Sequence, residues 1–253
     1  MGADDSAQAA TYAKSPLRAL ALMMFVMAIV VAALGAWALS RAAGGGGAPG
    51  APAGPLEPDP NVAGLTIPDF TLTNQAGETV SRASLLKGHV TIVDFIFTNC
   101  PFICPPMTNN MRALQEKLAG SGVRFASFSV DPKHDTPEAL RNFANAHGAD
   151  FANWSFLTGD IEQVQRILTQ GLHLDALAPI PSVPIKLKDG ATMANIRHPS
   201  HFVLVGPDAR VLTLTLGTQP ALHDAFAQRA RSAVEAAQTQ GRAAQAAPGG
   251  AGL

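Results

Sequence analysis

Residues 90–108 read VTIVDFIFTNCPFICPPMT, an apolar run that leads into the only two cysteines of the chain. The run is rich in β-branched and aromatic residues and is followed by a proline cluster, a pattern that predicts a buried strand and then a turn. Pro105 and Pro106 are tolerated at the first positions of a helix, where their missing N–H groups would have no partner. We therefore expect Cys100 and Cys104 between a strand and the amino end of a helix.

This placement has chemical consequences for the two thiols. The amino end of a helix carries a partial positive charge and free N–H groups, which stabilise a thiolate and lower the pKa of a cysteine. Two sulfurs at this spacing can form a disulfide or bind one soft metal ion. Thiolate pairs select Cu(I) or zinc, and a third, imidazole ligand would suit copper in either oxidation state. The local sequence thus indicates a redox pair or a metal site.

Composition excludes some classes of function. The chain has 253 residues and a formal net charge of -1, so it lacks the basic surface typical of nucleic-acid binding, and we expect no nucleic-acid partner. Two cysteines separated by three residues argue against a scaffold stapled by disulfides and for a single functional pair.

Residues 19–40 contain no charged side chain and are strongly apolar, which predicts one transmembrane helix. Lys14 and Arg18 precede this run and only Arg41 follows closely, so the charge bias predicts a cytoplasmic amino terminus. The expected location is the inner membrane, as a single-pass protein with its C-terminal domain in the periplasm. A cleaved signal peptide is the alternative, because residues 36–38 read AWA. Either interpretation places the cysteines in an oxidising compartment.

The chain divides by composition into five segments. Residues 1–18 form the expected cytoplasmic segment, which precedes the apolar run. Residues 41–61 are rich in Gly, Ala and Pro and predict a flexible linker. Residues 62–240 carry the periodic patterns of a folded domain, and residues 241–253, rich in Ala, Gly and Gln, predict a disordered tail.

Strand and helix patterns alternate within the expected domain. Strands are predicted at 90–97, 123–130, 154–159, 201–205 and 211–216, after an amino-terminal hairpin at 69–80. Helices are predicted after Cys104, at 136–147, at 160–170 and at 220–238. The stretch 174–195 has several prolines and no sustained period, which predicts irregular structure. This order predicts an α/β thioredoxin-like fold with an added N-terminal β-hairpin.

Four motifs occur together in an order that is characteristic of one family. They are FTNC and CPPMT around the cysteines, SVDP with DTP at 129–137, WSFLTG at 154–159, and His198 followed by VLVGPD at 203–208. Taken together, they resemble the Sco/SenC family over roughly residues 62–238. The resemblance implies a thioredoxin-like copper protein, tethered to a membrane, that helps assemble the binuclear copper A centre of cytochrome c oxidase.

The resemblance also implies a ligand set. It assigns the copper ion, Cu(I) or Cu(II), to Cys100, Cys104 and one histidine, which the motif spacing places at His198. Arg197 stands where the family often has an acidic residue, so His201 is kept as the alternative ligand.

Three further positions are candidates for roles beside the site. Asp131 and Asp135 match an acidic pair of the family and are not expected to be ligands. Asp94 lies inside the apolar strand, where it is either a buried acid near the thiols or a residue exposed at a sheet edge.

Met107 begins a series of apolar residues at helical spacing. The series predicts a packed helix face, which we favour over a thioether ligand for Met107.

Two functions remain open at this point. The first is a copper metallochaperone that delivers its ion to subunit II of cytochrome c oxidase, with a thiol reductant and another copper chaperone as further partners. The second is a thiol-disulfide reductase that keeps the copper-ligand cysteines of the oxidase reduced and needs the same redox-active pair, Cys100 and Cys104, but no histidine. A peroxiredoxin is disfavoured because the sequence before Cys100 lacks the P-x-x-x-T-x-x-C arrangement.

Overall fold

The computed structural model describes residues 23–24, 27–31 and 54–246, and the chain forms two units, 1–52 and 53–253. The strands of the second unit are β1 (Thr71–Asn74), β2 (Thr79–Ser81), β3 (Thr91–Ile96), β4 (Arg124–Ser129), β5 (Trp154–Thr158), β6 (Ala178–Lys186), β7 (Thr192–Arg197), β8 (His201–Val205) and β9 (Val211–Leu216). The helices are α2 (Arg82–Leu86), α3 (Cys104–Lys117), α4 (Pro137–Ala146), α5 (Ile161–Arg166) and α6 (His223–Ala246). Short helical turns η1 (Pro60–Val62), η2 (Ile167–Gly171) and η3 (Pro220–Leu222) complete the elements.

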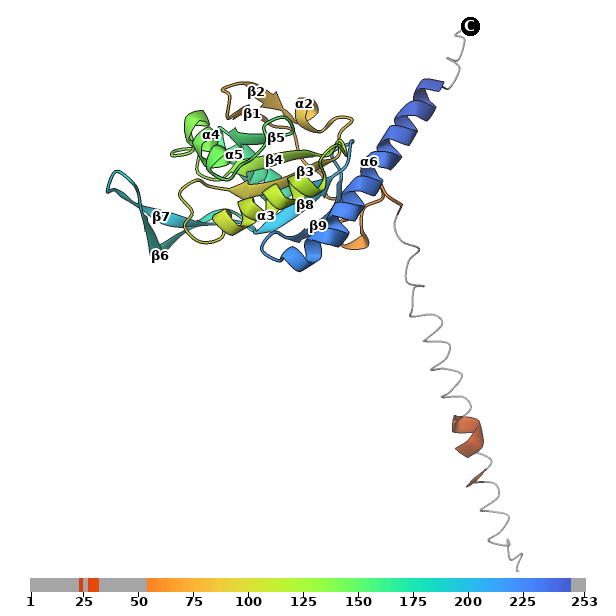
Figure 1. The fold of residues 1–253 in the computed structure, drawn as a ribbon. Helices are drawn as coiled ribbons and strands as arrows, with labels where there is room; N and C mark the ends of the chain where they lie inside the picture. Colours follow the sequence, from red (N-terminus) through yellow and green to blue (C-terminus); the bar gives the residue numbers. More distant parts are fainter. Residues whose placement is uncertain (1–22, 25–26, 32–53, 247–253) are drawn as a thin grey trace, which may run out of the picture. The chain divides into compact units, whose positions relative to one another are not determined.

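Seven strands form one mixed sheet in the order β2-β1-β5-β4-β3-β8-β9 (Figure 1). The three central strands, β3, β4 and β5, are parallel, and the strands on either side of them run antiparallel to their neighbours. This arrangement confirms the predicted mixed α/β, thioredoxin-like fold and its added N-terminal hairpin, β1–β2. The hairpin turn is closed by Asn74, whose side-chain oxygen accepts hydrogen bonds from the backbone N–H groups of Ala76 and Glu78.

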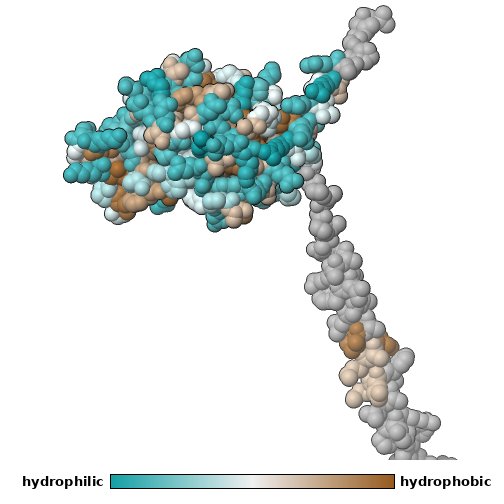
Figure 2. All heavy atoms as spheres, viewed as in Figure 1, coloured by the Kyte–Doolittle hydropathy of each residue, from teal (hydrophilic) through white to brown (hydrophobic). Residues whose placement is uncertain are grey.

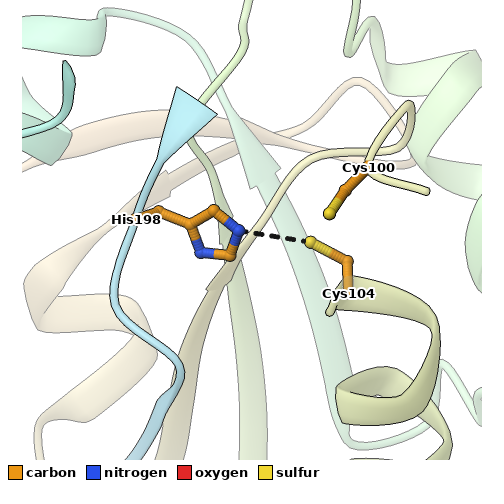
Figure 3. A group of neighbouring side chains, drawn as sticks. All are labelled: Cys100, Cys104 and His198. Carbon is orange, nitrogen blue, oxygen red and sulfur yellow. Dashed lines mark hydrogen bonds between the residues drawn. The ribbon is translucent and has the colours of Figure 1, made fainter. Parts of the chain in front are cut away.

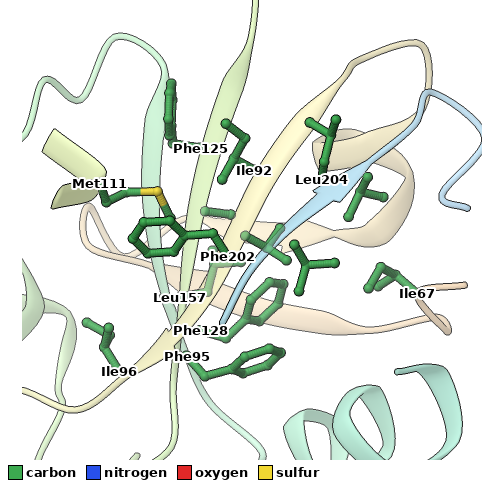
Figure 4. Close-up of a cluster of buried hydrophobic side chains, with 14 of the residues drawn as sticks. Ile67, Ile92, Phe95, Ile96, Met111, Phe125, Phe128, Leu157, Phe202 and Leu204 are labelled. Carbon is green, nitrogen blue, oxygen red and sulfur yellow. The ribbon is translucent and has the colours of Figure 1, made fainter. Parts of the chain in front are cut away.

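The core lies on both faces of the central strands. All six residues of β3 are buried, as expected for a parallel strand that is covered on both sides. Figure 4 shows Phe95 and Phe128 among the buried side chains of this core, and the rings of these two residues stack with their centroids 5.7 Å apart. Each such side chain contributes about 1.5–3 kcal/mol through burial. The packed core therefore fixes the end of β3, from which the cysteine loop starts.

Helices α3 and α6 lie across the same face of the sheet (Figure 1). Asn110 of α3 donates a hydrogen bond to the carbonyl oxygen of Gly217, 2.8 Å away, and Lys117 pairs with Asp224 of α6. Met107 is fully buried on α3 together with Met111, so the packed helix face that the sequence predicted is present. These contacts hold α3, whose first residue is Cys104, against the sheet and against α6.

Strands β6 and β7 form a separate two-stranded sheet where the sequence predicted irregular structure. The hairpin extends away from the main sheet in Figure 1, and Figure 2 shows apolar atoms on the surface there. Three prolines occur in β6, at positions 179, 181 and 184. Proline is tolerated in β6 because this strand pairs with a neighbour on one side only. The sequence pattern does not show that the second neighbour is missing. Strand β7 ends one residue before His198.

Both ends of the folded domain differ from their predicted boundaries. Residues 54–61 belong to the predicted linker, yet the backbone N–H of Asp59 bonds to the carbonyl oxygen of Leu212, and Arg229 donates to the carbonyl oxygen of Gly54. Helix α6 continues through residues 241–246, because Ala, Gln and Arg favour a helix even where no core holds it. Residues 41–53 of the predicted linker and 247–253 of the predicted tail lie outside the described residues.

The predicted transmembrane helix over residues 19–40 is corrected by the structure. In the described part of the chain, no helix is both long enough and apolar enough to cross a membrane. The backbone is described as helical at 23–24 and 27–31, and the other residues of the predicted span, like the predicted cytoplasmic segment 1–18, lie outside the described residues. The predicted single-pass location in the inner membrane, with the domain in the periplasm, is corrected for the same reason.

Candidate metal and redox site

The two cysteines lie where the loop after β3 meets α3, as the sequence predicted. The backbone N–H of Cys100 donates to the carbonyl oxygen of Phe97, 3.2 Å away, which turns the chain back after the strand. Cys104 is the first residue of α3, and prolines follow it in the first turn of the helix. Cys100 is 5% exposed and Cys104 is fully buried, and the two are not joined by a disulfide.

His198 reaches the cysteines from the other side of the site (Figure 3). It lies between β7 and β8, and its Nε2 atom is 3.4 Å from the Sγ atom of Cys104. Its Nδ1 atom is 3.1 Å from the carbonyl oxygen of Pro199. A carbonyl oxygen can only accept, so Nδ1 carries the hydrogen and the lone pair of Nε2 faces the sulfur. The ring also contacts Phe97 edge-on, with 5.6 Å between ring centroids.

The structure brings Cys100, Cys104 and His198 together and leaves His201 apart. One possible ligand atom from each of the three residues lies within 4.8 Å of the others, the only such group of His, Cys, Asp and Glu side chains in the described part of the chain. His201 is the first residue of β8, and its Nδ1 atom is buried without a hydrogen-bond partner. Burial lowers the pKa of His201. Of the two candidate histidines, only His198 is placed to bind the same metal ion as the two cysteines.

The two thiols share one negative charge. Hydrogen bonding from Cys104, and to a smaller extent from the backbone, lowers the pKa of Cys100 to about 4, although burial opposes this effect. The same hydrogen bond to Cys100, together with burial, raises the pKa of Cys104. Cys100 is therefore the thiolate, and Cys104 is the thiol that donates to it. A pair in this state is ready for nucleophilic attack or for binding a soft metal ion.

This assignment predicts a selective alkylation reaction. With iodoacetamide, reduced protein should be modified first at Cys100, and the rate should stay nearly constant from pH 8 down to about pH 5 because the nucleophile remains ionised. Peptide mass spectrometry after timed quenching measures the rate at each cysteine. If the alkylation rate at Cys100 instead falls tenfold for each pH unit below pH 8, Cys100 is an ordinary thiol and the assignment is wrong.

Asp94 is fully buried in β3, which excludes exposure at a sheet edge. It lies opposite Ser127 in the register of β3 and β4, and neither of its carboxylate oxygens has a hydrogen-bond partner among the described residues. Burial raises the pKa of Asp94 to about 7. Of the two alternatives that the sequence left open for Asp94, the structure shows the buried acid, inside the sheet that supports the site.

The acidic pair on the loop after β4 makes two different sets of contacts. Asp131 accepts a hydrogen bond from Nδ1 of His134, 2.7 Å away. Asp135 is fully buried and accepts hydrogen bonds from Thr98 and Ser129. Neither acid belongs to the group of three possible ligands. Thr98 and Ser129 fall within the motifs FTNC and SVDP, but neither was assigned a role from the sequence.

The donor set of this site suits a soft metal ion. Two sulfurs, one already ionised, and one imidazole nitrogen with a free lone pair are the ligands that copper prefers. A carboxylate does not contribute to the group, which disfavours hard ions such as magnesium or calcium.

Comparisons with known proteins agree with this arrangement. The sequence model of the SCO1/SenC family matches residues 58–235. The SCO1 protein homolog of Bacillus subtilis is 41% identical over 170 residues, which are 65% of this chain and 80% of that protein. A Stutzerimonas stutzeri protein named for copper binding is 34% identical over 145 residues, 56% of this chain and 65% of that protein.

A solved structure shares both fold and sequence with this chain. It is BsSco, described as a member of the Sco family of cytochrome c oxidase assembly proteins that has a disulfide switch. It superposes with a TM-score of 0.57 at 38% identity, over 70% of this chain and 97% of that one. The family match covers more than half of the sequence and spans every element around the site. This chain therefore belongs to the SCO1/SenC family.

Proposed function

We propose that this protein is a copper metallochaperone, which binds one copper ion through Cys100, Cys104 and His198 and helps assemble the binuclear copper A centre of cytochrome c oxidase. The observation that carries the proposal is the approach of three possible ligand atoms to within 4.8 Å of one another. The names of the related proteins support it, since one relative is named for copper binding and BsSco is described as an oxidase assembly protein.

A site of this kind suits transfer as well as binding. Structural zinc sites use four protein ligands in a closed tetrahedron, whereas the group here offers three. A three-ligand site leaves a coordination position that a thiolate of the acceptor can enter before the ligands of the donor leave. Subunit II of the oxidase is the proposed acceptor, and another copper chaperone is the proposed donor.

Binding also requires a proton to leave. Cys100 is already ionised, but Cys104 keeps its proton in the free protein because the hydrogen bond to Cys100 and burial raise its pKa. Coordination by both sulfurs displaces this proton, so copper uptake should release about one proton for each ion bound near neutral pH. The pair must also be reduced beforehand, and a thiol reductant is the proposed partner for that step.

Replacing His198 with alanine tests the ligand set. The reduced full chain with His198→Ala should bind Cu(I) about 10- to 100-fold more weakly, because two thiolates remain but the imidazole is lost. His201→Ala removes a histidine three residues away that lies outside the group and serves as the matched control, with an expected change of less than about twofold. Competition against a chromophoric Cu(I) chelator under anaerobic conditions measures both affinities.

Equal affinities for the wild type and His198→Ala, or a greater loss in His201→Ala, would contradict the proposed ligand set. A second arm tests the function itself. Copper-loaded protein is mixed with the metal-free copper A domain of subunit II, and the visible absorption of the acceptor is followed. Transfer by the wild type but not by His198→Ala supports the metallochaperone, and no transfer by either contradicts it.

Thiol-disulfide reduction is a second candidate function, and the low pKa of Cys100 favours it. A thiolate beside a buried thiol is suited to attack a disulfide and then to release the product through the second sulfur. The disulfide to be reduced would be the one formed by the copper-ligand cysteines of the oxidase. This activity needs no histidine, so a His198→Ala variant that loses copper but still reduces disulfides would separate the two functions.

A further inference from the structure

One buried carboxylate connects the cysteine loop to the next strand of the sheet. The Oδ1 atom of Asp135 accepts from the hydroxyl of Thr98 at 2.6 Å and from its backbone N–H at 3.1 Å. The Oδ2 atom accepts from the hydroxyl of Ser129, at the end of β4, also at 2.6 Å. Asp135 is fully buried, so this carboxylate is shielded from water and its bonds are correspondingly strong.

Thr98 occupies a sensitive position in the loop. It lies between Phe97, whose carbonyl oxygen accepts from the N–H of Cys100, and Cys100 itself. Phe97 also contacts the ring of His198. A displacement of Thr98 would therefore move the turn that carries Cys100 and the aromatic ring that packs against His198.

The backbone of Asp135 is itself held in place. Its backbone N–H donates to the carbonyl oxygen of Asp131, and the next residue, Thr136, caps α4 through its side chain. The carboxylate thus extends from a rigid turn at the start of a helix. Fixing the loop by a side chain of another element restricts the positions that the first sulfur can take.

We propose that Asp135 is a positioning residue for the cysteine pair, which holds Thr98 and thereby sets the distance of the Cys100 sulfur from Cys104 and His198. The inference concerns the site of the proposed function and rests on it for its consequence in copper binding. Its consequence for the thiols holds without any metal. An ionised carboxylate accepts all three hydrogen bonds, whereas an amide at the same place would have to turn an N–H₂ group toward one of the donors.

Three substitutions separate positioning from general stability. Asp135→Asn removes the charge, and Thr98→Val removes the hydroxyl that reaches the cysteine loop. Ser129→Ala is the matched control, because it removes a hydrogen bond of equal length to the same carboxylate without touching that loop. The free energy of unfolding of each reduced variant is measured by urea denaturation to confirm folding.

The first readout is metal-free. The protein is equilibrated with glutathione and glutathione disulfide, so that Cys100 and Cys104 are oxidised to a disulfide while one glutathione disulfide is reduced to two thiols. Asp135→Asn should shift this equilibrium constant by about tenfold and Thr98→Val by about threefold, and the double variant should change no more than Asp135→Asn alone. Ser129→Ala should lower stability but leave the equilibrium constant within about twofold.

The second readout is copper. Asp135→Asn should weaken Cu(I) binding by about tenfold and alter the thiolate-to-Cu(II) absorption bands, while Ser129→Ala keeps both close to wild type. If Ser129→Ala shifts both readouts as much as Thr98→Val, or if folded Asp135→Asn leaves them unchanged, the positioning role is wrong. A wild-type protein that binds no copper would overturn the proposed function, while the glutathione equilibrium would still decide the role of Asp135.

Discussion

Oxidation of Cys100 and Cys104 to a disulfide is expected to reduce Cu(I) affinity at least about a thousandfold. A disulfide sulfur carries no thiolate charge, so of the three ligand atoms that lie within 4.8 Å only the Nε2 atom of His198 would remain a good donor. Loss of two ligands out of three should remove more than about 4 kcal/mol of binding free energy, which corresponds to this factor. The state of the pair would therefore decide whether the protein can carry copper.

The measurement compares fully reduced protein with protein oxidised by glutathione disulfide. Both are titrated with Cu(I) in the presence of a competing chelator, and the oxidised sample is then reduced with dithiothreitol and titrated again. Recovery of the affinity shows that oxidation acted only on the thiols. Cys104→Ser provides the control for the loss of a single sulfur, and its affinity should fall between the two forms. Equal affinity of the reduced and oxidised forms would contradict the assignment of both sulfurs as ligands.

The sequence predicted the features of this site that depend on neighbouring residues. Cys100 and Cys104 were placed correctly because strand, turn and proline signals all lie within residues 90–108. His198 is 94 positions from Cys104 and no local pattern marks it, so it was identified only through the family resemblance. The structure then separates it from His201, which a motif spacing alone could not do.

Contacts between distant segments account for what the sequence did not show. The hydrogen bonds between Asp135 and Thr98 join residues 37 positions apart in the sequence, and no local pattern around either residue predicts the contact. The hairpin of β6 and β7 was missed because prolines normally break strands, and the sequence does not show that β6 would pair on one side only. Asp94 was noticed, but whether it was buried depended on β4 and β8 covering both edges of β3.

Replacing Asp94 with asparagine is expected to stabilise the protein above pH 7. Burial raises the pKa of Asp94 from 3.8 to about 7, so the folded protein keeps a proton that the unfolded chain releases near pH 4. Between these two values, folding takes up a proton and the free energy of unfolding falls as pH rises. The fall is complete above about pH 7 and amounts to about 4 kcal/mol, since each pH unit is worth ~1.4 kcal/mol.

Asp94→Asn abolishes this titration while it keeps the size and shape of the side chain. The variant should exceed the wild type in stability at pH 8 by up to about 4 kcal/mol, less the cost of burying an amide, and should lose that advantage at pH 4. Urea unfolding of the reduced protein at pH 4, 5.5 and 8 measures the difference. Asp175→Asn, at an exposed position, serves as the control and should follow the wild type at every pH.

Part of the pH dependence should remain in the Asp94→Asn variant. Burial also raises the pKa of Asp135 to about 6, so a smaller decline in stability between pH 4 and 6 is expected in both proteins. The gap between the two curves should therefore widen steadily from about pH 4 to about pH 7 and stay constant above it, because the contribution of Asp135 is common to both proteins. If the curves instead stay parallel from pH 4 to 8, Asp94 does not hold its proton in the folded state. Its carboxylate would then have a partner or a water contact that offsets the cost of burial.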